Sequence, residues 1–232
     1  MILKRGLSKS LIMARSRKLP EKADIEGLTK EALSNDEVLQ SHIEKLSGDS
    51  RSARQISASV LSAVAIEKPE VIEQNLSPIF DALNRPERQT RWECLNMLAR
   101  FADKHQSECE SVIEQAESAL FDEQSGILRF SAFDFLCKVG KCSAKASDKV
   151  WPLIDEAVQC YHGDVEFNDM LVSLLDFSEG RISAHVKEGL VELFEFDAKT
   201  ATGNLQAKAV AIIANCKPKK KTIAKKTTKK KG

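Results

Sequence analysis

The residues best suited to chemistry lie together in residues 83–102, which hold Arg91, Trp92 and Cys94. A guanidinium can form paired hydrogen bonds with a phosphate, and an indole ring can stack on a nucleobase that has been turned out of its helix. Arg54 and Arg129 occur at matching places in related segments, so the three arginines could follow a phosphate backbone. The alternative, which we favour, is a structural ladder in which each arginine pairs with an acid of an adjacent turn.

The aromatic ring of Trp92 has a counterpart in Phe130, which suggests a platform for base stacking. The same position is polar in two other copies of the segment, where it holds Gln55 and Asn168. A position that alternates between aromatic and polar residues is typical of the edge of a core. We therefore favour packing over base stacking for Trp92 and Phe130.

Potential ligands and acid or base groups are densest at Tyr161, His162, Asp164, Glu166 and Asp169. This cluster falls on a predicted turn between helices, where a Gly-Asp pair is expected for turn geometry and capping alone. The sequence contains no nucleophile elbow, no phosphate-binding glycine loop and no HExxH motif. We predict no catalytic residue, no metal site and no cofactor.

The segment at residues 90–102 recurs along the chain at intervals of 37 or 38 residues. Copies lie at residues 53–65, 128–140 and 166–178, and a degenerate copy lies at residues 205–216. Their apolar residues align in columns spaced three residues apart, as one stripe of a helix requires. The columns are Ala58, Leu95, Phe133 and Leu171, then Leu61, Leu98, Leu136 and Leu174, then Val64, Phe101, Val139 and Phe177.

Further helices are predicted between these copies, at residues 36–46, 70–83, 107–120, 149–158 and 186–194. Turn residues at Gly48, Pro86, Gly126 and Gly163 separate the two helices of each pair. A two-helix unit of about 37 residues cannot bury its apolar faces alone, so neighbouring units must stack. The predicted fold is an all-α, right-handed α-α superhelix of about five helical hairpins with an N-terminal helical cap.

At this point the chain resembles the HEAT repeat family, whose units pair two helices and often carry Asp in the turn and Arg early in the second helix. Asp49 and Arg54 match that spacing, and Asp122 and Arg129 match it loosely. The resemblance implies an armadillo-type solenoid that binds other macromolecules. Armadillo repeats themselves would need a third short helix, for which 37 residues leave little room.

The second helix of each hairpin leaves several side chains free of the core stripe. In a solenoid of this type they line the concave surface, where partners dock, although a merely solvated face would look the same. The predicted partner-binding residues are Glu93, Asn96, Arg100, Asp134, Lys138, Asp169 and Asp176, with Ser131 beside them.

The charges divide the chain into three parts. Residues 1–19 form a basic arm without acids, which fits an organellar transit peptide, a disordered arm, or translation that starts at Met13. Residues 20–216 are the solenoid, with repeats predicted at 34–69, 70–106, 107–144, 145–182 and 183–216. Residues 21–216 carry 20 Lys or Arg against all 34 Asp or Glu, a net charge of −14. Six cysteines without a CxxC pair, and no apolar run of membrane-spanning length, favour a reduced cytoplasmic protein.

Residues 217–232 form a lysine-rich tail that we predict to be disordered. Its candidate nucleic-acid contacts are Lys219, Lys220, Lys221, Lys225, Lys226, Lys229, Lys230 and Lys231. The predicted function is a non-catalytic scaffold that holds a protein partner on its concave face, with the tail giving nonspecific contact to nucleic acid or the ribosome. The alternative is an enzyme related to the HEAT-like DNA glycosylases, or another nucleic-acid-processing enzyme. No oligomeric state is predicted.

Overall fold

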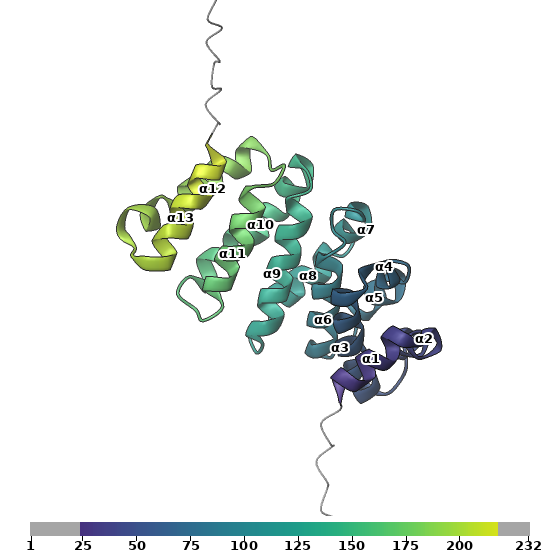
Figure 1. Cartoon of the computed structure of the whole chain (residues 1–232). Helices are drawn as coiled ribbons and strands as arrows, with labels where there is room; N and C mark the ends of the chain where they lie inside the picture. The colour runs from purple at the N-terminus through teal and green to yellow at the C-terminus, as the bar shows by residue number, and fades with distance from the viewer. Residues whose placement is uncertain (1–23, 218–232) are drawn as a thin grey trace, which may run out of the picture.

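The computed structural model describes residues 24–217, which fold into a curved array of helices (Figure 1). The predicted basic arm and the tail lysines at 219–231 lie outside the described residues. Within the described range all regular structure is helical, which confirms the predicted all-α solenoid. None of these helices is long and apolar enough to cross a membrane. The helices are α1 Ile25–Ser34, α2 Asp36–Lys45, α3 Arg51–Glu67, α4 Pro69–Glu73, α5 Leu76–Ala82, α6 Arg88–Ala99, α7 Gln106–Glu110, α8 Ile113–Leu120, α9 Gly126–Gly140, α10 Ala144–Tyr161, α11 Phe167–Ser178, α12 Ala184–Thr200 and α13 Gly203–Cys216.

Several helices begin at a polar residue whose side chain satisfies a free backbone N–H of the first turn. Ser50, Ser125, Ser143 and Ser183 each accept such a hydrogen bond at the start of α3, α9, α10 and α12. The Ser143 cap starts α10 five residues before the start predicted at residue 149. These caps fix where each turn ends and so help to fix the spacing of the units.

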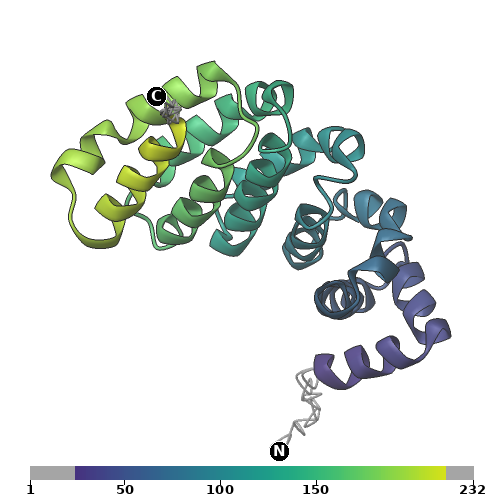
Figure 2. The same ribbon diagram turned by 45° about the horizontal axis from the view of Figure 1, so that its top comes forward.

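The helices form two layers that follow the same curve. Helices α3, α6, α9, α11 and α13 line the inner, concave side, and α10 and α12 lie on the outer side with the shorter helices (Figure 2). The layers meet in one continuous apolar core, in which Leu61, Leu95, Phe133 and Phe177 are fully buried. All twelve residues of the three predicted apolar columns are buried there. At the N-terminal end, α1 packs against α2 and α3.

Two outer helices that the sequence predicts as single are each divided. Residues 70–83 form α4 and α5, because Pro78 has no N–H for a helical bond and its ring would clash with the carbonyl of Gln74. Residues 107–120 form α7 and α8, and at the junction the Ser111 hydroxyl donates to the Glu108 carbonyl at 2.6 Å. These two units contain three helices each. The expectation that 37 residues leave little room for a third helix was therefore wrong for these two units.

Gly140, the last residue of α9, sits where three helices converge. A Cβ atom at this position would lie 2.5 Å from Val150 Cγ2 and 2.7 Å from Phe177 Cε2, both in the core. Only a residue without a side chain lets α9 approach α10 and α11 this closely.

We predict that Gly140→Ala lowers the free energy of unfolding by about 1–3 kcal/mol, because the added methyl overpacks a filled core. Urea denaturation followed by circular dichroism measures the change. Gly48→Ala is the matched control, since its Cβ would meet nothing closer than a backbone oxygen at 3.4 Å. Equal stability of the two variants would contradict the close packing at Gly140.

Candidate partner-binding groove

Arg54 is buried and joins two successive units. Its Nη1 donates to the Gly48 carbonyl at 2.7 Å, and its Nε and Nη2 donate to the two carboxylate oxygens of Glu87. Glu87 is 4% exposed, and the hydrogen bonds from Arg54 lower the pKa of its carboxyl group. A bidentate pair that is sealed from water is geometrically specific, so it sets the position of α6 against α3.

The other two arginines of the predicted ladder have different partners. Arg129 donates to Glu166 Oε1 at 2.6 Å and to the Asp122 carbonyl at 3.1 Å, and its guanidinium lies 5.0 Å from the ring centre of Tyr161. Arg91 instead donates to a backbone carbonyl and a serine hydroxyl, and burial lowers its pKa. Within residues 24–217 it has no carboxylate at ion-pair distance.

Most of the remaining chemical candidates of the sequence are occupied or buried, whereas Asp164 and Asp169 are exposed. Trp92 and Phe130 are half-buried and pack against the core. Cys94 is fully buried, and burial raises the pKa of its thiol well above the usual range. His162 lies 3.0 Å from Asp197 Oδ2 and packs on the Phe167 ring. The described residues contain no group of three metal-ligating side chains.

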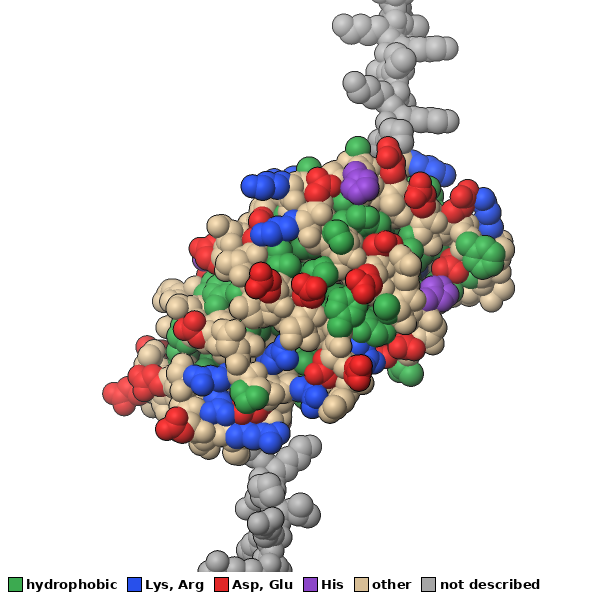
Figure 3. Space-filling model, turned by 180° about the vertical axis from the view of Figure 1, so that it is seen from behind, with side chains coloured by type: hydrophobic (Ala, Val, Ile, Leu, Met, Phe, Trp, Pro, Cys, Tyr) green, Lys and Arg blue, Asp and Glu red, His purple; other side chains and the backbone are tan. Residues whose placement is uncertain are grey.

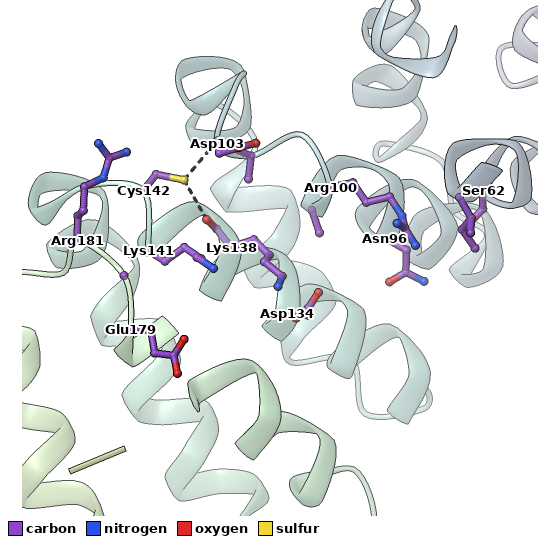
Figure 4. A pocket seen from close by; sticks show the side chains of 14 residues that line it. Ser62, Asn96, Arg100, Asp103, Asp134, Lys138, Lys141, Cys142, Glu179 and Arg181 are labelled. Atoms are coloured by element: carbon purple, nitrogen blue, oxygen red, sulfur yellow. Dashed lines mark hydrogen bonds between the residues drawn. The ribbon is translucent and has the colours of Figure 1, made fainter. Parts of the chain in front are cut away.

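A groove of about 820 Å³ lies on the concave side, toward the carboxyl ends of α6 and α9 (Figure 4). It brings together four of the predicted partner-binding residues, Asn96, Arg100, Asp134 and Lys138. The rest of its polar lining is Ser62, Asp103, Lys141, Cys142, Glu179 and Arg181. Figure 4 shows Asn96 and Arg100 on one wall and the side chains of α9 on the other.

Hydrogen bonds to α11 hold the α9 wall of the groove in place. Lys138 Nζ lies 2.8 Å from Asp176 Oδ2, and Lys141 contacts the other oxygen of the same carboxylate. Burial alone would raise the pKa of Asp176, but the hydrogen bonds from both lysines outweigh it and lower the pKa. Asp134 accepts a hydrogen bond from Ser173 Oγ at 2.7 Å. This wall is therefore preorganised.

The rim of the groove carries charges of both signs that are available to a ligand. Arg100 and Arg181 are exposed, and in the described part of the chain neither has a carboxylate at ion-pair distance. Asp103 and Glu179 are exposed at the same rim. Such a surface is suited to a polar segment with mixed charges.

The other predicted partner-binding residues lie outside the groove lining. Glu93 accepts a hydrogen bond from Ser59 Oγ at 2.9 Å and so joins α6 to α3. Asp169 is exposed on α11, Asp176 holds the two lysines of α9, and Ser131 is buried. Of the predicted partner-binding residues, Asn96, Arg100, Asp134 and Lys138 are therefore the ones that a ligand in the groove would meet.

Sequence reasoning missed the groove residues that follow the helices. Asp103, Glu179 and Arg181 lie beyond the ends of α6 and α11, so helical periodicity does not mark them. The acidic partners of Arg54 and Arg129 could have been found from the repeat spacing of the sequence. Glu87 follows Arg54 by 33 residues and Glu166 follows Arg129 by 37, which is close to one repeat in each case.

One row of inner positions changes character along the array. At intervals of 37 or 38 residues it reads Ser59, Asn96, Asp134, Val172 and Val210. Val172 and Val210 are 53% and 50% exposed. This row is therefore polar over α3, α6 and α9 and apolar over α11 and α13.

Comparisons of the sequence with protein-family models and with curated proteins find no match. The structure is similar to an engineered protein, with a TM-score of 0.63 and 12% identity over 83% of this chain and 88% of that chain. It is also similar to a designed armadillo repeat protein in complex with the peptide (KR)4, with a TM-score of 0.63 and 14% identity over 83% and 91%. Armadillo repeat proteins designed for modular peptide recognition match with a TM-score of 0.60 and 15% identity over 82% and 91%.

At these identities the similarity shows the fold alone. The chain is a helical-repeat solenoid of the armadillo-like kind. The HEAT family itself stays a prediction, whereas the broader class of stacked helical repeats is shown by the helices and by these neighbours.

We predict that Glu87→Gln lowers the urea midpoint at pH 7 and that the difference from the unchanged protein narrows below about pH 4. The folded-state pKa of Glu87 is depressed, so its ionised form adds stability above the unfolded value of about 4.3. That stability is lost as the pH falls through the folded-state value. Glu117→Gln, at an exposed residue of α8, is the control. A midpoint unchanged by Glu87→Gln at pH 7 would rule out a stabilising role for the pair.

Proposed function

We propose that this solenoid is a non-catalytic scaffold that binds an extended protein segment in the groove between α6 and α9. The observation that carries the proposal is the groove itself, where Asn96, Arg100, Asp134 and Lys138 converge from two inner helices. Two of these side chains are already fixed by α11, so little order has to be created when a ligand binds.

The charges of the groove define the kind of segment that fits. Arg100 and Arg181 would receive carboxylates, and Asp103 and Glu179 would receive lysines or arginines. Asn96 adds an amide that can donate to and accept from a peptide backbone. The designed neighbour that binds (KR)4 supports a peptide as the ligand class, through the shared fold. The net charge of −14 over residues 21–216 opposes a phosphate backbone, which favours protein over nucleic acid as the ligand of the body.

The lysine-rich tail would serve a second, looser contact. Residues 217–232 hold nine lysines and no acid, whereas residues 21–216 have a net charge of −14. A polymer of phosphates would therefore be attracted to the tail and repelled by the body. Release of counterions would give weak, salt-sensitive binding to nucleic acid or the ribosome without sequence preference.

We predict that Arg100→Glu combined with Lys138→Glu weakens binding of the protein partner by about tenfold or more, equal to roughly 1.4 kcal/mol. Affinity capture from the native host identifies the partner, and titration with the purified partner measures the change. Lys45→Glu combined with Lys145→Glu, two charge reversals at exposed residues of α2 and α10, is the control and should bind as the unchanged protein does. If the double variant keeps its partners at full affinity, the groove is not the docking surface.

We predict that the full chain binds duplex DNA of random sequence in a salt-dependent way that requires the tail. Replacing the eight lysines at 219–231 by glutamine should flatten the plot of log K against log salt by about 0.9 for each phosphate that the tail no longer neutralises. Fluorescence anisotropy over a salt series measures the slope. Equal slopes for the two proteins would show that the tail makes no phosphate contacts.

A further inference from the structure

The chain leaves the solenoid beside a second groove. Helix α13 ends at Cys216, and Lys217 adopts an extended conformation with φ −76° and ψ 145°, as expected for a residue that precedes proline. Lys217 lines a groove of about 1070 Å³ between α12 and α13. The lysine-rich tail therefore starts inside this groove.

The wall of this groove formed by α12 carries two acids beside one base, Lys187. Glu188 and Glu192 both line it, and their spacing of four residues places them on one face of the helix. In the described part of the chain neither has a cation at ion-pair distance. Glu195 continues the stripe one turn further, and its pKa is lowered chiefly by Lys199 and also by Lys217. The first lysine of the tail lies in the same groove as Glu188 and Glu192.

The acidic surface extends beyond the groove. Glu188 and Glu192 also line a hollow on the other side of α12, together with Asp155 of α10. Acidic side chains, with several lysines or arginines among them, are spread over the upper half of the face seen in Figure 3. The concave groove differs, because four basic side chains line it beside three acids. Charge therefore directs a lysine-rich segment toward α12.

We propose that the first lysine cluster of the tail, Lys219 to Lys221, folds back into the groove between α12 and α13 and pairs with Glu188 and Glu192. Alternate residues of an extended chain lie about 6.6 Å apart, and side chains four residues apart on a helix lie about 6 Å apart, so the two patterns match. Lys221 is four residues from Lys217 and can reach about 13 Å along the groove.

The tether makes this docking effective although each exposed ion pair is weak. A segment joined to its site by one or two residues is present at a high effective concentration, so binding costs little further entropy. The docked state should be salt-sensitive, because the charges remain at the surface. Docking would also withhold three lysines from nucleic acid, a consequence that rests on the proposed function of the tail.

Carbodiimide cross-linking of the full chain tests the docking, since it joins a lysine amine to a carboxylate only in direct contact. We expect the cross-links of Lys219 to Lys221 to fall mainly on Glu188 and Glu192. They should decrease by about fivefold between 0.1 M and 1 M salt, as the screening length shrinks from about 10 Å to about 3 Å. The pair of Lys104 and Glu73, 2.9 Å apart, serves as the internal standard.

Two double variants test whether the tail contacts the glutamates of α12 specifically or any acidic side chains of the body. Glu188→Gln with Glu192→Gln should remove the expected cross-links, whereas Glu114→Gln with Glu117→Gln, at exposed residues of α8, should leave them unchanged. An even spread of tail cross-links over the acids of the body would overturn the docking. So would cross-links found only between light and heavy isotope-labelled copies of the chain.

The same variants distinguish docking of the tail from its proposed contact with nucleic acid. If a docked tail competes with nucleic acid, Glu188→Gln with Glu192→Gln raises the affinity of the full chain for duplex DNA by about two- to fivefold, as the free fraction of tail increases. DNA binding by the tail without the expected cross-links would overturn the docking proposal and support the proposed nucleic-acid contact of the tail. Cross-links without DNA binding would do the reverse.

Discussion

Every helical unit of this protein depends on its neighbour for burial, because a hairpin of about 37 residues has apolar residues on more than one face. Several side-chain hydrogen bonds likewise join a residue of one unit to a residue of the adjacent unit. Arg54 bonds to a residue 33 positions away, Lys138 to one 38 positions away and Tyr161 to one 41 positions away, each in the next or previous unit. Core and polar contacts therefore repeat with the same period, and the curvature of the array follows from how closely each pair of inner helices can pack.

Within that repeating plan the polar contacts are not uniform. The Arg54 and Glu87 pair is sealed in the interior, where loss of one partner would leave a buried charge. Arg129 bonds to the carboxylate of Glu166 and also lies over the ring of Tyr161, whereas Arg91 bonds to neutral groups. One arginine position thus joins units in three chemically different ways. The inner surface is left free to vary, which is where the groove with Arg100 and Lys138 lies.

Periodicity predicted the inner helices and the core, because residues such as Leu95, Phe133 and Leu171 recur at one repeat's spacing and are all fully buried. It did not predict the division of the outer helices at Asn75 and Val112, which depends on single local events and breaks no apolar pattern. Only some of the residues that line the groove could be predicted from the sequence. Asn96 and Lys138 belong to helical positions that repeat, whereas Asp103 and Arg181 belong to turns whose path is set by the packing of the helices around them.

One row of inner positions changes from polar at Ser59, Asn96 and Asp134 to apolar at Val172 and Val210, which gives the concave face a direction. A surface built from identical repeats would accept an extended chain in either orientation, since each unit would present the same groups. Here the two ends differ, so reversing a bound segment would place its charged residues on valines and its apolar residues on aspartate and arginine. If the proposed function holds, this asymmetry would favour one direction of the bound segment, so the array would read chain polarity as well as composition.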